Sequence, residues 1–116
     1  MFLETAALGK ELSDLKDSFL EGRTPSETAI VFDWDNWWAV EYSAGPSVLM
    51  KYLDAVKDYY TAAFEQNVPV DIISVEDDML SYKVVIAPLL YMTKTGYAKK
   101  VNQFVEQGGI FITTYF

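Results

Sequence analysis

The sequence predicts an α/β fold in which a parallel sheet carries helices on both faces, a doubly wound arrangement. Short, continuously apolar runs rich in β-branched residues alternate with segments of helical periodicity, as in buried parallel strands joined by crossover helices. The chain has 116 residues, the size of one domain. Hydrophobic residues make up 51% of it and charged residues 22%, so it can bury a core.

The first segment predicts an amphipathic helix over residues 4–21. Its apolar side chains follow one another at steps of four, three, four and one, which keeps a single helical face apolar. These side chains are Leu8, Leu12, Leu15, Phe19 and Leu20. Gly22 is suited to end the helix, and the polar residues 23–27 predict a linker.

A strand, helix, strand unit is predicted next. Residues 28–32 are apolar and β-branched and predict the first strand, and a polar, aromatic loop is expected over 33–46. After Gly45 and Pro46, Ser47 is a candidate N-cap of a helix with apolar residues at helical spacing up to Phe64. Asn67 closes this helix, and residues 68–74 predict the second strand.

The remaining residues predict two strands and one helix. An acidic connector over 75–81 leads to a third strand at 83–87. Thr95 is a candidate N-cap of a helix that ends at Gly108 and Gly109, and residues 110–115 predict the fourth strand. Right-handed crossovers favour the flavodoxin-like strand order 2-1-3-4. Because the chain stops at this edge strand, we expect a fragment truncated after strand four.

Charge and composition narrow the possible functions. The formal net charge of −8 repels phosphate backbones and anionic membranes, so we expect neither nucleic acid nor a membrane as partner. Cysteine and histidine are absent, which excludes disulfides, thiolate nucleophiles, imidazole bases and thiolate or imidazole metal sites. We expect no metal and no cofactor. The N-terminus lacks the features of a signal peptide, and a cytoplasmic location is predicted.

Ligands of open α/β sheets bind at the carboxyl ends of the strands, so residues 33–46, 74–81 and 88–95 are the informative loops. The first holds all three tryptophans of the chain, among carboxylates. Either these rings enlarge the core, or they contact a partner surface or the apolar face of a sugar. The candidate site residues are Asp33, Trp34, Asp35, Asn36, Trp37, Trp38, Glu41 and Tyr42.

An alternative interpretation starts from Asp33 and Asp35. An apolar strand followed by Asp-x-Asp resembles the first motif of haloacid dehalogenase-type, magnesium-dependent phosphatases, in which one aspartate is the nucleophile and the next an acid/base. The further groups of such a site would be sought among Ser74, Lys83, Lys94, Asp77 and Asp78. However, Trp37 stands where that family has Thr or Val, and an exposed acidic turn is the simpler interpretation of Asp77 and Asp78.

A second resemblance covers residues 28–116. The segments AIVFDWDNWWAVEYSAGPS, DIIS, YKVVIAPLLY and FVEQGGIFITTYF are similar to the middle domain of glycoside hydrolase family 42 β-galactosidases. The resemblance implies a fold like flavodoxin and class I glutamine amidotransferases, and a role in forming a homotrimer. Amidotransferase activity itself is excluded, since that chemistry needs a cysteine and a histidine.

The same resemblance implies that catalysis and trimerisation belong to different domains of a longer protein. Residues 1–27 resemble the segment that leaves the catalytic barrel, and 28–116 a partial trimerisation domain. The catalytic glutamates and most galactoside contacts belong to the barrel, which this chain lacks, so no catalytic residue is assigned. The parent enzyme is expected to hydrolyse terminal β-galactosides. The motif from Phe32 to Trp38 is expected near the subunit interface or at the rim of a neighbouring sugar cleft, with Tyr91 and Met92 as further inter-subunit contacts.

Overall fold

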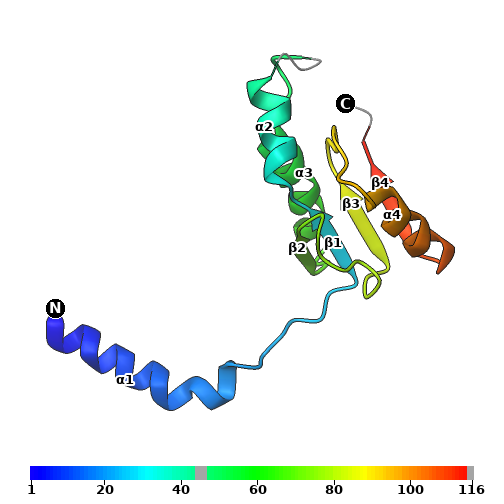
Figure 1. Ribbon diagram of the computed structural model, residues 1–116. Helices are drawn as coiled ribbons and strands as arrows, with labels where there is room; N and C mark the ends of the chain where they lie inside the picture. Colours follow the sequence, from blue (N-terminus) through cyan, green and yellow to red (C-terminus); the bar gives the residue numbers. More distant parts are fainter. Residues whose placement is uncertain (44–46, 115–116) are drawn as a thin grey trace.

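The computed structural model describes residues 1–43 and 47–114. Its centre is a parallel sheet of four strands in the order β2-β1-β3-β4, as predicted (Figure 1). The strands are β1 (Thr28–Val31), β2 (Val70–Ile73), β3 (Val84–Ala87) and β4 (Ile110–Thr113). Each begins and ends within two residues of the predicted bounds. Tyr115, the last residue of the predicted fourth strand, lies outside the described residues.

The two faces of the sheet are covered by different helices. α3 (Tyr52–Glu65) leads from β1 to β2 and contacts both, whereas α4 (Tyr97–Glu106) joins β3 to β4 and contacts β4. Ala29 and Val31 pack in one core cluster with Tyr97 and Phe104 of α4, and Phe32 packs in another with Tyr52 of α3. Because successive side chains of a strand point to opposite faces, α3 and α4 lie on opposite sides of the sheet.

A row of isoleucines crosses the α3 face of the sheet. Ile30 pairs in register with Ile72 of β2 and Ile86 of β3, and Ile86 pairs with Ile112 of β4. Among the described helices, only α3 lies over this face, and it contacts β1 and β2. The β3–β4 half is therefore open, and Ile110 and Ile112 are 57% and 40% exposed.

The N-terminal helix stands apart from the sheet. α1 (Phe2–Phe19) confirms the predicted helix, shifted by two residues, and an extended linker joins it to β1 (Figure 1). It has no buried residue, and it contacts no other helix or strand of the described chain. Its apolar side chains, Leu12 and Phe19 among them, are exposed.

The prediction of a loop over residues 33–46 was wrong for most of that segment. Residues 34–42 form a further helix, α2 (Trp34–Tyr42), which continues beyond the end of β1 (Figure 1). The helix gave no helical pattern of apolar residues because its buried face is partly polar. Its two buried residues are Asn36, which is 1% exposed, and Val40, which is 3% exposed. Residues 44–46, with Gly45 and Pro46, lie outside the described part of the chain.

Two predicted caps were also wrong. Ser47 accepts a hydrogen bond from the Leu49 N–H in a turn, and α3 begins later, after Lys51, because the Glu41 carboxylate accepts from the Tyr52 N–H. At α4 the N-cap is Gly96 rather than Thr95, with a φ of 86° that glycine adopts without strain. In the described residues, no helix is long and apolar enough to cross a membrane.

Candidate functional site

Asp33 fixes the start of α2 at the carboxyl edge of the sheet. Its backbone is extended, and its Oδ2 accepts hydrogen bonds from the Asn36 N–H (3.0 Å) and the Asn36 Nδ2 (2.6 Å). The Asp33 N–H donates to the Tyr52 hydroxyl of α3 at 2.9 Å. A capping carboxylate satisfies helix N–H groups that have no partner within the helix. Asp33, only 5% exposed, therefore sets the direction in which α2 leaves β1.

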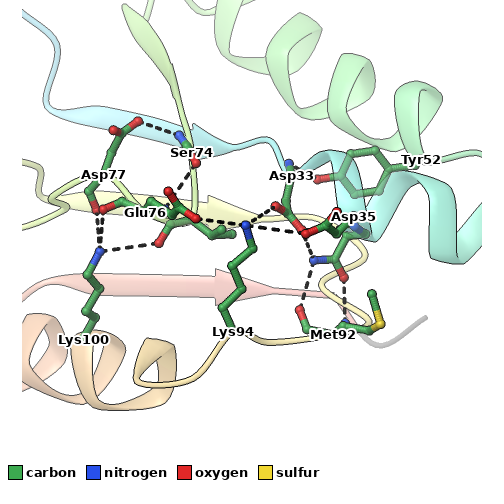
Figure 2. A network of polar contacts seen from close by, with 11 residues as sticks. Asp33, Asp35, Tyr52, Ser74, Glu76, Asp77, Met92, Lys94 and Lys100 are labelled. Atoms are coloured by element: carbon green, nitrogen blue, oxygen red, sulfur yellow. Dashed lines mark hydrogen bonds and ion pairs between the residues drawn. The ribbon is translucent and has the colours of Figure 1, made fainter.

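Asn36 joins α2 to the loop between β3 and α4. Its Nδ2 donates to the Met92 carbonyl at 3.0 Å, and its Oδ1 accepts from the Met92 N–H at 2.7 Å (Figure 2). The side-chain amide thus pairs with the backbone as a neighbouring strand would. Met92 and Tyr91 are 44% and 43% exposed on this loop. The contact holds their backbone at a fixed position relative to the tryptophan helix.

The three tryptophans divide between core and surface. Trp37 packs against the buried cluster of Val40 and Tyr52, whereas Trp34 and Trp38 are 55% and 53% exposed. The ring centroids of Trp34 and Trp37 lie 5.2 Å apart, and those of Trp34 and Trp38 lie 6.1 Å apart. The core interpretation therefore holds for Trp37, and the exposed rings of Trp34 and Trp38 rest on or near it.

A hollow of about 470 Å³ lies beside the exposed pair. Its lining combines apolar side chains with charged ones. The apolar ones are Phe32, Trp34, Trp38, Ile72 and Ile73, and the charged ones are Asp33, Asp35, Glu76 and Lys94. The hollow opens where β1 and β2 end, the edge at which open α/β sheets bind ligands. Apolar walls with a few convergent polar groups are the usual composition of a binding site.

Lys94 connects three carboxylates around this hollow. Its Nζ lies 3.1 Å from Glu76 Oε1, 3.5 Å from Asp35 Oδ2 and 3.8 Å from Asp33 Oδ1 (Figure 2). The hydrogen bond to Glu76, and the negative charges of Glu76, Asp33 and Asp35, raise the pKa of Lys94. The ammonium thus ties the loops after β2 and β3 to the start of α2.

The loop that carries Glu76 is held by a second lysine. Lys100 of α4 donates from Nζ to the backbone oxygens of Glu76 (2.7 Å) and Asp77 (3.1 Å), as Figure 2 shows. Asp77 Oδ2 accepts from the Ser74 N–H at 2.7 Å. Asp77 and Asp78 are exposed residues whose carboxylates bond within the turn, as the simpler interpretation expected.

The structure brings only some of the eight predicted site residues together. Four of them, Asp33, Trp34, Asp35 and Trp38, line the hollow, and Asn36 and Trp37 support it from within. Glu41 instead caps α3, and Tyr42 is 76% exposed at the end of α2. Ile72 and Glu76 were not predicted, and Lys94 was considered only for a phosphatase. Both Glu76 and Lys94 lie in loops that follow strands, and this position was the sequence feature from which they could have been predicted as site residues.

The chain is similar to parts of β-galactosidases in sequence and in structure. The family model described as the β-galactosidase trimerisation domain matches residues 26–116. The β-galactosidase BgaA of Planococcus sp. (strain 'SOS Orange') is 54% identical over 116 residues, which cover 100% of this chain and 17% of that protein. The chain thus spans about a sixth of the length of the curated relatives that it matches.

Solved structures show the same relationship. The crystal structure of β-galactosidase from Bacillus circulans sp. alkalophilus matches with a TM-score of 0.85 and 50% identity, covering 99% of this chain and 17% of that one. A GH42 β-galactosidase from G. stearothermophilus matches with a TM-score of 0.80 and 34% identity, covering 98% and 17%. Nothing in the comparisons supports the phosphatase alternative.

Proposed function

Because the chain belongs to the family of β-galactosidase trimerisation domains, we propose that it joins subunits of a β-galactosidase through the exposed pair Trp34 and Trp38. The observation that carries this proposal is the exposure of two adjacent indoles on a helix whose start is fixed by buried hydrogen bonds. Tryptophan is enriched among the residues that dominate binding energy, and a rigid anchor loses little entropy on association.

The most direct test is the mass of the chain in solution. Light scattering across a hundredfold range of concentration is expected to show a rise toward three chains, with closed threefold symmetry. Trp38→Ala is expected to shift this association to about thirtyfold higher concentration. A loss of about 1.4 kcal/mol at each of the three contacts weakens the trimer about a thousandfold, and the midpoint concentration follows the square root of that factor. Phe64→Ala is the matched control, because Phe64 is 69% exposed on α3, outside the hollow. A mass of one chain throughout, or equal effects of both substitutions, contradicts the proposal.

The activity of the whole protein is part of the same proposal. We assign hydrolysis of terminal β-galactosides to a barrel domain outside this chain, with residues 1–27 as the segment that leaves it and 28–116 as the trimerisation unit. The parent enzyme would act in the cytoplasm as a homotrimer. The apolar face of α1, which contacts no described strand or helix, suits a helix that packs on such a barrel. The purified chain is expected to show no cleavage of a nitrophenyl β-galactoside, and measurable turnover contradicts this assignment.

A second role is favoured by the hollow itself. Aromatic faces beside carboxylates suit a pyranose ring, and Trp34 and Trp38 lie beside Asp35 and Glu76. The hollow would then form the rim of a neighbouring subunit's sugar cleft. Titration with galactose is expected to change the tryptophan fluorescence, and this change is lost in Trp38→Ala. An unchanged spectrum at saturating galactose rejects this role for the chain.

A further inference from the structure

We propose that the hollow beside Trp34 and Trp38 receives an arginine side chain presented by a neighbouring subunit. This inference rests on the proposed function, since it names the chemistry of the contact that the tryptophan pair makes. Negative charge, exposed aromatic faces and an apolar floor all meet in the hollow.

The hollow carries an excess of negative charge. Asp33, Asp35 and Glu76 all lie within 3.8 Å of Lys94, so three carboxylates share one ammonium and the cluster has a net charge of −2. The side chains of Asp35 and Glu76 are 54% and 74% exposed, and their second oxygens can accept further hydrogen bonds. A cation entering here is attracted by both carboxylates, whereas a neutral sugar leaves the excess charge in place.

The exposed indoles favour a planar cation. The rings of Trp34 and Trp38 are tilted by 47° to each other and line the same hollow as Asp35 and Glu76. A guanidinium stacks on an indole face and donates two parallel hydrogen bonds to a carboxylate. A lysine ammonium offers no planar fork, and it loses more hydration when it leaves water.

The floor of the hollow accommodates the stem of such a side chain. Ile72, which is 53% exposed at the end of β2, lines it together with Phe32. The methylene groups of an arginine can cover this apolar surface while the head group reaches the carboxylates. Burying Ile72 and the two indoles removes apolar surface that the described chain leaves in water.

The test uses a single arginine side chain as probe. N-acetyl-arginine amide is added to the chain at concentrations where light scattering gives the mass of one chain, and the indole N–H signals are followed by NMR. The signals of Trp34 and Trp38 are expected to shift more than that of Trp37, whose indole N–H is buried. The uncharged isostere N-acetyl-citrulline amide is expected to bind at least about fivefold more weakly.

Substitutions identify the charged partners. Glu76→Gln and Asp35→Asn are each expected to weaken binding of the arginine derivative about threefold or more, and raising the salt concentration should do the same. Asp58→Asn is the control, since Asp58 is an exposed carboxylate on α3, outside the hollow. Equal binding of the arginine and citrulline derivatives, no effect of Glu76→Gln and Asp35→Asn, or preferential binding of galactose overturns the inference.

The inference and the proposed function fail separately. If the chain associates through Trp38 but the arginine derivative does not shift the indole signals, association stands and the guanidinium contact is refuted. If the derivative binds as expected while the chain keeps the mass of one chain, the hollow recognises arginine, and the proposal that this chain alone joins subunits is contradicted.

Discussion

Two buried tyrosines provide a matched pair of substitutions that differ by one hydroxyl each. Tyr52 is 1% exposed, and its hydroxyl accepts a hydrogen bond from the Asp33 N–H at 2.9 Å. Tyr97 is 3% exposed, and its hydroxyl is buried with no hydrogen-bond partner among the described residues. Replacement by phenylalanine removes the same oxygen from both. We expect the free energy of unfolding to change in opposite directions.

The size of each change follows from what the hydroxyl touches. Tyr52→Phe leaves the Asp33 N–H without its acceptor at the start of α2, a loss of about 2 kcal/mol for a buried donor. Tyr97→Phe removes a polar atom whose burial is uncompensated, a gain of about 1 kcal/mol after the loss of a few dispersion contacts. The two variants should therefore differ by about 3 kcal/mol.

Urea unfolding at pH 7, followed by circular dichroism, measures this difference. With a slope of about 1–3 kcal/mol per molar urea, the two midpoints should be separated by about 1 M or more. Tyr42→Phe makes the same chemical change at a residue that is 76% exposed and should leave the midpoint unchanged. Equal destabilisation by Tyr52→Phe and Tyr97→Phe refutes the reasoning.

Three further predictions concern the same core. Burial raises the pKa of Tyr97 to about 12 from 10.0, with smaller contributions from Tyr52 and Asp33. Between pH 10 and 12 the folded chain keeps a proton that the unfolded chain loses, so the free energy of unfolding should fall with rising pH. This fall should be about 2 kcal/mol smaller in Tyr97→Phe than in the unchanged chain. Asn36→Ala removes three side-chain hydrogen bonds and should lower the free energy of unfolding, measured in urea, by about 2 kcal/mol. The control Asn102→Ala, at an exposed residue, should change it by less than about 0.5 kcal/mol. Equal effects of the two substitutions would contradict the role of Asn36. In Gly109→Ala the new Cβ would collide with the Phe104 ring, so the variant should lose about 2 kcal/mol of stability and its melting temperature should fall. An unchanged melting temperature would show that the ring moves at no cost.

The central strands β1 and β3 could be predicted from the sequence because each is a short, largely apolar run. Ile30 and Val85 are fully buried, and their neighbours are apolar on both faces of the sheet. Burial on both faces is what makes such a run recognisable without periodicity. The order then followed from the handedness of the crossovers, a constraint that acts on any chain of this pattern.

The tryptophan helix could not be recognised by the same means. Its buried positions include Asn36, a polar residue whose partners are the Met92 backbone and Asp33, the first of them 56 residues away. No window of local sequence contains that pairing. The local signal that did exist was Asp33 as a capping residue before Trp34, Trp37 and Trp38, which are spaced by three and one as on one side of a helix.

The charged part of the site was predictable by position only. Glu76 and Lys94 follow β2 and β3, which flank β1, and the carboxyl ends of all the parallel strands lie at one edge of the sheet. Which side chains of these loops face each other depends on the turn that Ser74 and Asp77 make, and on the hydrogen bonds from Lys100 to the backbone of that turn. The hydrogen bonds of Lys100 join residues more than 20 positions apart and have no local pattern.

The β3–β4 half of the α3 face of the sheet, which no described helix covers, has a consequence for the aggregation of the chain. Ile110 and Ile112 present an apolar strip on an edge strand, where molecules can meet strand to strand. At neutral pH the net charge of −8 keeps molecules apart by mutual repulsion. That repulsion vanishes near pH 4.3, the isoelectric point, while the strip is unaffected by acid. Mildly acidic buffers should therefore precipitate the isolated chain before they unfold it.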